Sequence, residues 1–240
     1  MNKNIIKSFS NKASSYDSQS FVQKNVNKRL LNRLDFIKHK KKHILEIGSG
    51  NGFFLEGLKK EKYNVSGCEI SKERLIHLKK LKNTTVYNHD FNFKVSELEG
   101  KFDIVVLFHV LEHISNPKKF LENVRGVLKG KGKIIVEVPN SDDHQLTLNE
   151  NYNQWYWQRA HVNYYHPKTL SEILTKSKFK KIKVFGIQRY SIENMFYWKL
   201  KNSPQKENPT FSLSKPFDWI EKSYKTRIEK KRVSDTIIAV

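Results

Sequence analysis

The stretch Ile44–Phe54, with the sequence ILEIGSGNGFF, decides the fold of this protein. Apolar residues that favour a β-strand run directly into three glycines, at positions 48, 50 and 52, each separated by one small polar residue. Glycines placed in this way let a backbone approach a ligand closely, or let it turn tightly between a strand and a helix. The surrounding sequence has to distinguish between these two uses.

Strand and helix patterns alternate along the rest of the chain. The order β-α-β-α-β-β-α-β up to residue 140 predicts a parallel sheet with right-handed crossovers. Ser71 is expected to cap its helix, and Gly130 to close the helix that begins near Pro117. Residues 191–215 show no clear pattern and are expected to be irregular. We predict strands over 43–47, 63–70, 84–90, 102–110, 132–140, 179–190 and 234–240, and helices over 21–38, 52–62, 71–82, 116–129, 166–178 and 217–231.

Composition indicates a soluble, cytoplasmic protein. The 240 residues are 38% hydrophobic, which is enough for a core. No apolar run reaches the roughly 18–20 residues that a membrane span needs, and residues 1–20 lack the apolar centre of a signal peptide. Cys68 is the only cysteine, so an intrachain disulfide and a cysteine-based zinc site are excluded.

The net charge of +21 is concentrated at the two ends of the chain. Residues 1–43 carry 11 Lys and Arg against 2 acids, residues 44–174 carry 18 against 16, and residues 175–240 carry 16 against 6. Lysines outnumber arginines 37 to 8, which is unlike proteins that read bases through arginine. A solvated basic surface is the main interpretation. The alternative is contact of the basic termini with an acidic partner, namely an anionic substrate, a membrane surface or RNA, of which nucleic acid is the least expected.

Acidic residues near the glycine loop distinguish between ligands. A dinucleotide loop reads Gly-x-Gly-x-x-Gly, whereas these glycines alternate and Glu46 precedes them. A carboxylate here repels a pyrophosphate and suits an ammonium group. Glu69, at the end of the next strand, can accept hydrogen bonds from both hydroxyls of a ribose. Asp90 and Phe91 suit an adenine amino group and a stacking wall, so the pattern favours a nucleoside joined to an amino acid.

Four segments, in this order, resemble the class I S-adenosylmethionine-dependent methyltransferases: ILEIGSGNG, VSGCEIS, FDIVVLFHVLEHISNP and LKGKGKIIVEVPN. The resemblance covers about residues 5–190. It implies an enzyme with S-adenosyl-L-methionine as its cofactor. The implied fold is an α/β Rossmann-like methyltransferase fold, a doubly wound seven-stranded and mostly parallel sheet that ends in an antiparallel hairpin.

The resemblance also suggests how the chain is organised. We expect one methyltransferase domain over residues 1–240. An N-terminal helical lid is expected over 1–38, and the cofactor-binding core over 39–140. An aromatic insertion on the substrate side, after the fifth strand, is expected over 141–166, and the C-terminal helices with the strand hairpin over 167–240.

By the same resemblance, the donor-binding residues lie at the ends of the first four strands. The glycine loop is expected beneath the methionyl portion, with Glu46 near its ammonium group. Glu69 is expected to hold the ribose, and Asp90 with Phe91 the adenine, while Tyr16 in the lid closes over the cofactor. A solvated acid is the alternative for Glu69, and a turn cap the alternative for Asp90. The full predicted set is Tyr16, Glu46, Gly48, Ser49, Gly50, Gly52, Glu69, Ile70, Asp90, Phe91 and Phe108.

Histidines are the candidate catalytic bases. Methyl transfer is an in-line displacement from a sulfonium, and it needs a base only when the acceptor loses a proton as it attacks. His109 and His161 are predicted for this role because the unperturbed pKa of histidine lies near neutrality. His113 is interpreted as structural. No metal is expected, because the family's metal-dependent catechol type has an acid where Phe108 and His109 stand here.

The acceptor is expected to bind near the insertion. Its aromatic residues, such as Trp155 and Tyr164, suit an apolar ring or a sugar, and equally suit a packed cap over the sheet. The leading hypothesis is O- or N-methylation of a small molecule, first a glycan or lipid-linked intermediate. A carrier-protein malonyl O-methyltransferase and a ubiquinone-type O-methyltransferase are alternatives. An RNA methyltransferase or a non-catalytic RNA-binding relative is the alternative of another class.

Overall fold

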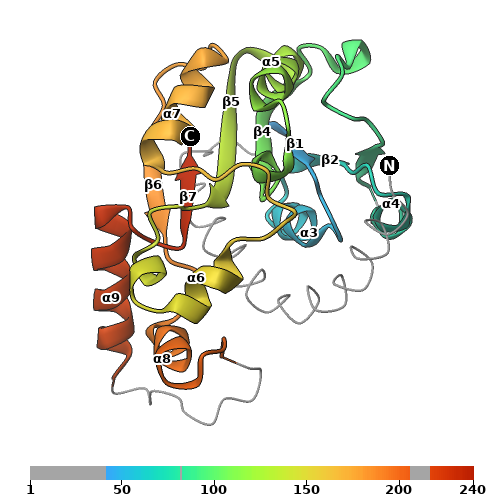
Figure 1. Ribbon diagram of the computed structural model, residues 1–240. Coiled ribbons are helices and arrows are strands. Elements are labelled where there is room, and N and C mark those ends of the chain that lie inside the picture. The colour runs from blue at the N-terminus through green and yellow to red at the C-terminus, as the bar shows by residue number, and fades with distance from the viewer. Residues whose placement is uncertain (1–41, 82, 206–216) are drawn as a thin grey trace.

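The structure, a computed structural model, describes residues 42–81, 83–205 and 217–240. The described chain forms a seven-stranded sheet in the order β3-β2-β1-β4-β5-β7-β6, with helices on both faces (Figure 1). All strand pairs are parallel except those of β7, which runs antiparallel to β5 and β6. The predicted doubly wound methyltransferase fold is therefore confirmed. The strands are β1 (His43–Ile47), β2 (Asn64–Cys68), β3 (Thr85–Tyr87), β4 (Phe102–Phe108), β5 (Leu128–Pro139), β6 (Val184–Ile187) and β7 (Thr236–Ala239).

Two of the predicted helices begin at the cap residues that the sequence offers. The Ser71 hydroxyl accepts a hydrogen bond from Arg74 N, as an N-cap should, and Asn116 caps the helix that opens with Pro117. The α-helices are α3 (Phe53–Lys60), α4 (Lys72–Leu78), α5 (Pro117–Val127), α6 (Glu150–Tyr156), α7 (Pro167–Lys176), α8 (Ile192–Lys201) and α9 (Asp218–Lys231). Short 3-10 helices are η2 (Ser96–Leu98), η3 (Leu111–His113) and η4 (His144–Thr147).

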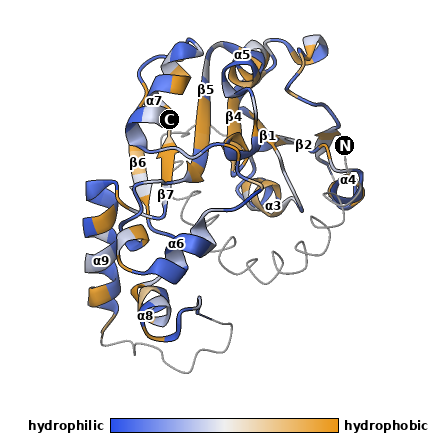
Figure 2. Ribbon diagram, viewed as in Figure 1, coloured by the Kyte–Doolittle hydropathy of each residue, from blue (hydrophilic) through white to orange (hydrophobic). Residues whose placement is uncertain are grey.

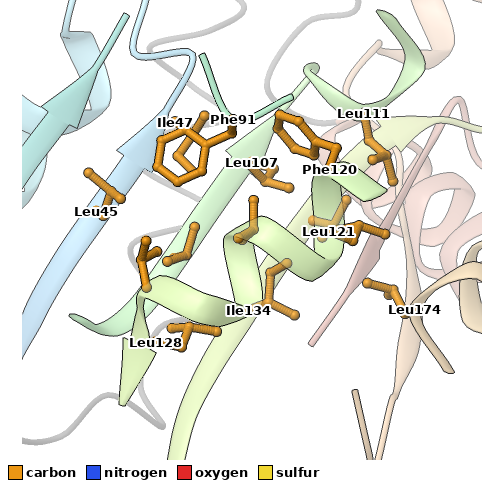
Figure 3. Packing of buried hydrophobic residues seen from close by; sticks show 14 of the residues in the cluster. Leu45, Ile47, Phe91, Leu107, Leu111, Phe120, Leu121, Leu128, Ile134 and Leu174 are labelled. Carbon is orange, nitrogen blue, oxygen red and sulfur yellow. The ribbon is translucent and has the colours of Figure 1, made fainter. Parts of the chain in front are cut away.

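The sheet is buried on both faces, and alternate residues of each strand serve opposite faces. On one face, Leu45 and Leu107 pack with α5 and α7 in a single cluster (Figure 3). On the other face, Ile44 and Val106 pack with α3 and α4. The hydrophobic colouring of β4, β5 and β7 in Figure 2 follows from this two-sided burial. The core thus holds the carboxyl ends of β1, β2 and β4 side by side, which is where ligands bind in such folds.

Two sequence predictions about element boundaries were wrong. Gly130 does not close α5, because the helix ends at Val127 and β5 begins directly with Leu128, so that Gly130 lies in the strand. The region predicted to be irregular contains α8, whose N-cap Ser191 accepts a hydrogen bond from Asn194 N. Its buried Trp198 packs against the insertion rather than the sheet, so the helix lacks the usual apolar periodicity.

Other predictions about the chain's organisation stay open. The expected lid, with the helix over 21–38 and Tyr16, lies outside the described residues, and so does most of the basic N-terminal region. The division into one domain with four parts likewise stays a prediction. Within the described ranges, no helix combines the length and the apolar character that a membrane span requires.

Candidate functional site

The glycine loop between β1 and α3 is fastened to the end of β2. Gly48 N and Ser49 N both donate to Cys68 O, at 2.8 and 3.1 Å. Gly48, Gly50 and Gly52 have φ values of 75°, 54° and 81°, a region that glycine adopts without strain. A Cβ on Gly48 would lie 2.5 Å from Val110 Cγ2. This part of the loop therefore needs glycine both for its backbone conformation and for its packing.

Ser49 holds the loop from within. Its buried hydroxyl donates to Glu46 O at 2.9 Å and accepts a hydrogen bond from Cys68 N at 3.1 Å. Because the side chain is engaged with the backbone of both strands, Ser49 is left to offer a ligand its backbone only. A Cβ on Gly67 of β2 would come within 2.8 Å of this hydroxyl, so β2 and the loop fit together closely.

Glu69 is held with its carboxylate at the mouth of the loop. Gly50 N donates to Oε2 and Ser71 N donates to Oε1, each at 2.9 Å. The side chain is buried, which keeps it in one orientation. Each oxygen retains a lone pair beyond the one it uses, so the carboxylate can accept from two neighbouring hydroxyls. This arrangement fits the diol of a ribose.

Glu46 is a buried acid that lacks a full set of partners. It is only 5% exposed, and its Oε2 has no hydrogen-bond partner in the described part of the chain. Burial raises its pKa well above the usual range, the charge of Glu69 raises it further, and the nearby Ser49 hydroxyl opposes both. An unpaired buried carboxylate is costly, and a cationic ligand would compensate it. The residues present therefore fit a ligand that combines a ribose with an ammonium group.

The other residues predicted for the donor site lie in different surroundings. Asp90 caps a turn, because its Oδ1 accepts from Asn92 N at 2.9 Å, which is the alternative role foreseen for it. Phe91 is 2% exposed and packs beside Phe120 in the core, so its ring does not form the expected stacking wall. Ile70 is 67% exposed next to Glu69, where it can line a pocket. Phe108, at the end of β4, lies edge-on to Phe54 with ring centroids 4.8 Å apart.

His109 lies at the centre of a buried charged network at the end of β4. Its Nδ1 lies 3.0 Å from Glu112 Oε1 and its Nε2 lies 3.1 Å from Glu137 Oε1. Arg189 Nη1 lies 2.7 Å from the same Nε2, while Arg189 Nε donates to Asp235 Oδ1 at 3.3 Å. The φ of His109 is 53°, an uncommon value for a residue with a side chain, so the network and the backbone together fix its place.

The network leaves His109 poorly placed to act as a base. Burial and Arg189 lower its pKa, but hydrogen bonds with Glu112 and Glu137 outweigh them and raise it. As a cation, His109 donates to both carboxylates. As a neutral ring, it offers Nε2 to Arg189. In both forms its nitrogens face protein groups, so the geometry argues for a positioning role, and the predicted catalytic role stays a prediction.

The insertion is docked on η3 through its loop before α7. Val162 N and Asn163 N both donate to Glu112 O, at 2.9 and 3.1 Å. His161, in the same loop, lies with its Nδ1 3.1 Å from the Tyr164 hydroxyl. Burial lowers the pKa of His161 to about 4, so the ring is neutral near pH 7. The structure thus brings both predicted bases close to η3.

Most of the aromatic residues of the insertion form a packed cap. Tyr152, Tyr156 and Trp198 are buried together, with Trp155 and Tyr164 packed against them. The Tyr152 hydroxyl donates to Asp143 in the segment that follows β5. By contrast, Trp157 is 46% exposed. The cap therefore accounts for most of these aromatic residues, whereas Trp157 keeps an exposed face.

Sequence reasoning missed the partners of His109. Glu137 and Asp235 are 1% and 2% exposed, and Arg189 joins them from the end of β6. A signal was present, since Glu137 interrupts the apolar strand IIVEVP and a charge in a fully buried strand needs a partner. That partner is His109, at the end of β4, and Arg189 joins the pair from the loop after β6, whose position the sequence alone does not specify.

This site lies at the carboxyl edge of a Rossmann-like sheet and fits a ligand that combines a ribose with an ammonium group. Comparison with known proteins identifies the class of protein. Residues 18–184 match a family described as a methyltransferase domain. The ubiquinone biosynthesis O-methyltransferase of Coxiella burnetii (strain Dugway 5J108-111) is 23% identical over 189 residues, covering 68% of this chain and 76% of that protein.

Solved structures share the fold. A SAM-dependent methyltransferase from Archaeoglobus fulgidus superposes with a TM-score of 0.58 at 22% identity, covering 89% of this chain and 91% of that one. Phosphoethanolamine N-methyltransferase 2 of Haemonchus contortus, in complex with S-adenosyl-L-methionine, gives 0.56 at 21% identity, covering 90% of this chain and 51% of that one.

The chain therefore belongs to this methyltransferase domain family, since the match spans well over half of it. It is a methyltransferase, as the sequence predicted, and it shares the fold of S-adenosylmethionine-dependent methyltransferases.

Proposed function

We propose that this enzyme methylates a hydroxyl oxygen of a small organic molecule, and that Glu46 and Glu69 hold the methyl donor. The observation that carries the donor site is the pair of buried acids beside the glycine loop, one of them with an unpartnered oxygen. The observation that supports an oxygen acceptor is the similarity to ubiquinone biosynthesis O-methyltransferases.

Within this proposal, each donor contact follows from the chemistry of the side chain. Glu69 accepts from the two ribose hydroxyls, and Glu46 faces the ammonium of the methionyl portion. Gly48, Ser49 and Gly50 pass beneath that portion with their backbone. Ile70 covers the adenine, while Asp90 approaches it from the turn that it caps.

Further donor contacts belong to the same proposal. Gly52, at the N-terminus of α3, lets the loop enter the helix, and Phe108 borders the methyl group. Phe91 contributes backbone rather than its ring. Tyr16 closes the site from the lid. Bound S-adenosylmethionine supplies a methyl group on a positively charged sulfur, a good leaving group, so the protein mainly has to position the acceptor and exclude water.

The acceptor side favours a molecule with an apolar ring or a lipid-linked group. Trp157 presents a half-exposed face, and Tyr164 lies beside it with ring centroids 4.5 Å apart. Such faces suit a ring or a sugar. A glycan or lipid-linked intermediate remains the first substrate to try, with a ubiquinone-type phenol next. His161 stays a candidate base, because it is neutral near pH 7 and lies between this face and η3.

A methyl-transfer screen tests the proposal. Purified enzyme and S-adenosylmethionine with a tritiated methyl group are incubated with fractionated cell extract and with a panel of catechols, phenols and sugars. The expected result is label in an organic small molecule, with a methyl ether identified by mass spectrometry. Label found only in RNA or protein, or only on nitrogen, would overturn the proposed acceptor. Parallel reactions with the same labelled donor and the Glu69→Ala enzyme distinguish enzymatic transfer from background.

A further inference from the structure

Three side chains with metal-binding atoms converge where the insertion meets η3. Glu112 and His113 belong to η3, and His161 comes from the loop that docks on it. One ligand atom from each of the three lies within 4.8 Å of the other two. The two imidazole rings lie 4.9 Å apart, centroid to centroid, at 68° to each other. The hydrogen bonds around the cluster determine which atoms are available.

His113 has its Nε2 lone pair available. Its Nδ1 lies 2.9 Å from Ala160 O. A carbonyl oxygen can only accept, so Nδ1 carries the hydrogen and donates it. In the neutral ring, Nε2 then has an unshared pair. The ring is at the surface, so a modest rotation can adjust the position of this nitrogen.

The same tautomer is imposed on His161 by Tyr164. The Tyr164 hydroxyl donates its only hydrogen to Tyr156 O at 3.1 Å and accepts from Gln158 N at 2.6 Å. His161 Nδ1, 3.1 Å from this oxygen, must therefore donate to it. The Nε2 of His161 is left with a lone pair, as in His113.

Glu112 supplies the negative charge. The side chain is 1% exposed, and its Oε1 is engaged with His109 Nδ1. Its other oxygen, Oε2, is buried and has no hydrogen-bond partner among the residues that the structure describes. A buried carboxylate oxygen without a partner is costly and suits a cation.

We infer that Glu112 Oε2, His113 Nε2 and His161 Nε2 bind a divalent transition-metal ion. Each ligand is oriented by a second contact on its far side: Glu112 by His109, His113 by Ala160 O, and His161 by Tyr164. Outer contacts of this kind are typical of metal ligands. Two imidazoles and one carboxylate suit Zn²⁺, Fe²⁺ or Co²⁺, whereas Mg²⁺ and Ca²⁺ prefer oxygen ligands throughout.

Such an ion would join the donor-binding core to the insertion at one point. Three protein ligands leave at least one coordination position open, which is the arrangement of catalytic rather than structural zinc. If the proposed function holds, on which this step rests, the open position would take the acceptor hydroxyl and lower its pKa. The lone pair of His161 then serves as a metal ligand, in place of the general base that the sequence predicted.

Titration of the full-length, untagged, chelator-treated enzyme with Zn²⁺ and with Co²⁺ tests this inference. We expect one ion per chain by calorimetry, and a visible absorption band for Co²⁺. His161→Gln and His113→Gln should each weaken Zn²⁺ binding by more than the roughly 10–100-fold that the loss of an outer-shell partner costs. His77→Gln, at an exposed histidine on α4, is the matched control and should bind like the wild type.

Binding of S-adenosylhomocysteine, measured on the same samples, separates this inference from the proposed donor site. It should be retained in both histidine variants, which also shows that they are folded. Failure of the wild type to take up either ion would overturn the metal site, as would equal Zn²⁺ binding by the wild type and both variants. Loss of S-adenosylhomocysteine binding by the wild type, with metal binding intact, would instead overturn the donor site alone.

Discussion

The two halves of the site are assembled differently. On the donor side, Glu69 is held by backbone N–H groups of Gly50 and Ser71, and Ser49 is held by backbone atoms of two adjacent strands. On the acceptor side, His109 is held by side chains of Glu137 and Arg189, which lie 28 and 80 positions away. The donor half of the proposed site, the glycine loop with Glu46 and Glu69, depends on short motifs. The acceptor half, the His109 network and the insertion that docks on η3, depends on long-range charge pairing. Substitutions in the two halves should therefore separate donor binding from turnover.

The largest effect on donor affinity is expected for Glu69→Ala. The change removes both ribose contacts and leaves Gly50 N and Ser71 N without their acceptor. Two charge-assisted hydrogen bonds contribute about 3 kcal/mol or more, so calorimetry should show S-adenosylhomocysteine binding weakened by roughly 100-fold or more. Glu73→Ala, at an exposed acid on α4, is the control and should bind normally.

Glu46→Gln should weaken donor binding less than Glu69→Ala does, by roughly 10–30-fold. The same substitution should stabilise the ligand-free enzyme at alkaline pH. Below the ordinary pKa of glutamate, Glu46 is protonated in both the folded and the unfolded chain, so the two proteins should be equally stable. As the pH rises through the raised pKa of folded Glu46, the wild type acquires an uncompensated buried charge and loses stability.

Thermal melts of the ligand-free proteins check the sign of this effect. The melting temperature of the variant should exceed that of the wild type at about pH 8, and the difference should vanish at about pH 4. A variant that is less stable at pH 8 would show that Glu46 has a protein partner and is not reserved for a ligand.

Gly67→Ala should have a smaller effect on donor affinity, because it acts only through the packing of the loop. The added methyl group would lie 2.7 Å from Leu55 Cδ1 and 2.8 Å from Ser49 Oγ. Moving Ser49 loosens the loop, so we expect roughly tenfold weaker donor binding and a loss of about 1–3 kcal/mol in the free energy of unfolding. Gly126→Ala, where a Cβ meets nothing within 4 Å, is the matched control and should be neutral or slightly stabilising.

Tyr152→Phe should have the smallest effect on donor affinity, because Tyr152 lies wholly in the acceptor half. The substitution leaves Asp143, which is buried, without the hydroxyl that donates to it. Urea denaturation should show a loss of about 1–3 kcal/mol, with donor affinity unchanged within twofold. Donor binding reduced as much as in Gly67→Ala would show that the two halves are not separable.

The same contrast explains how far the sequence could predict the molecule. The fold around the donor half was predictable because its signals are local: the strand before the glycines, the caps at Ser71 and Asn116, and the acid at the end of β2. Its contacts with a ligand stay predictions. Gly130 misled because a glycine after a helical pattern was read as a cap, although β5 begins at Leu128 and pairs there with β4. Phe91 was predicted as a stacking wall for adenine, but its ring packs beside Phe120 in the core.

The acceptor half could be predicted only in outline. Histidines near the end of β4 were identified, but their roles depend on Arg189 and Asp235, brought in by a hairpin that inserts β7 between β5 and β6. The convergence of Glu112, His113 and His161 depends in the same way on the docking of the insertion on η3. No local pattern specifies either contact.

A crystal structure of the enzyme with S-adenosylhomocysteine tests the central claim most directly. We expect both ribose hydroxyls to lie within hydrogen-bond distance, about 2.6–3.2 Å, of the Glu69 carboxylate. We expect the ligand's ammonium group to face Glu46 Oε2. A ligand bound with its ribose elsewhere, or with Glu46 still unpartnered, would contradict the claim.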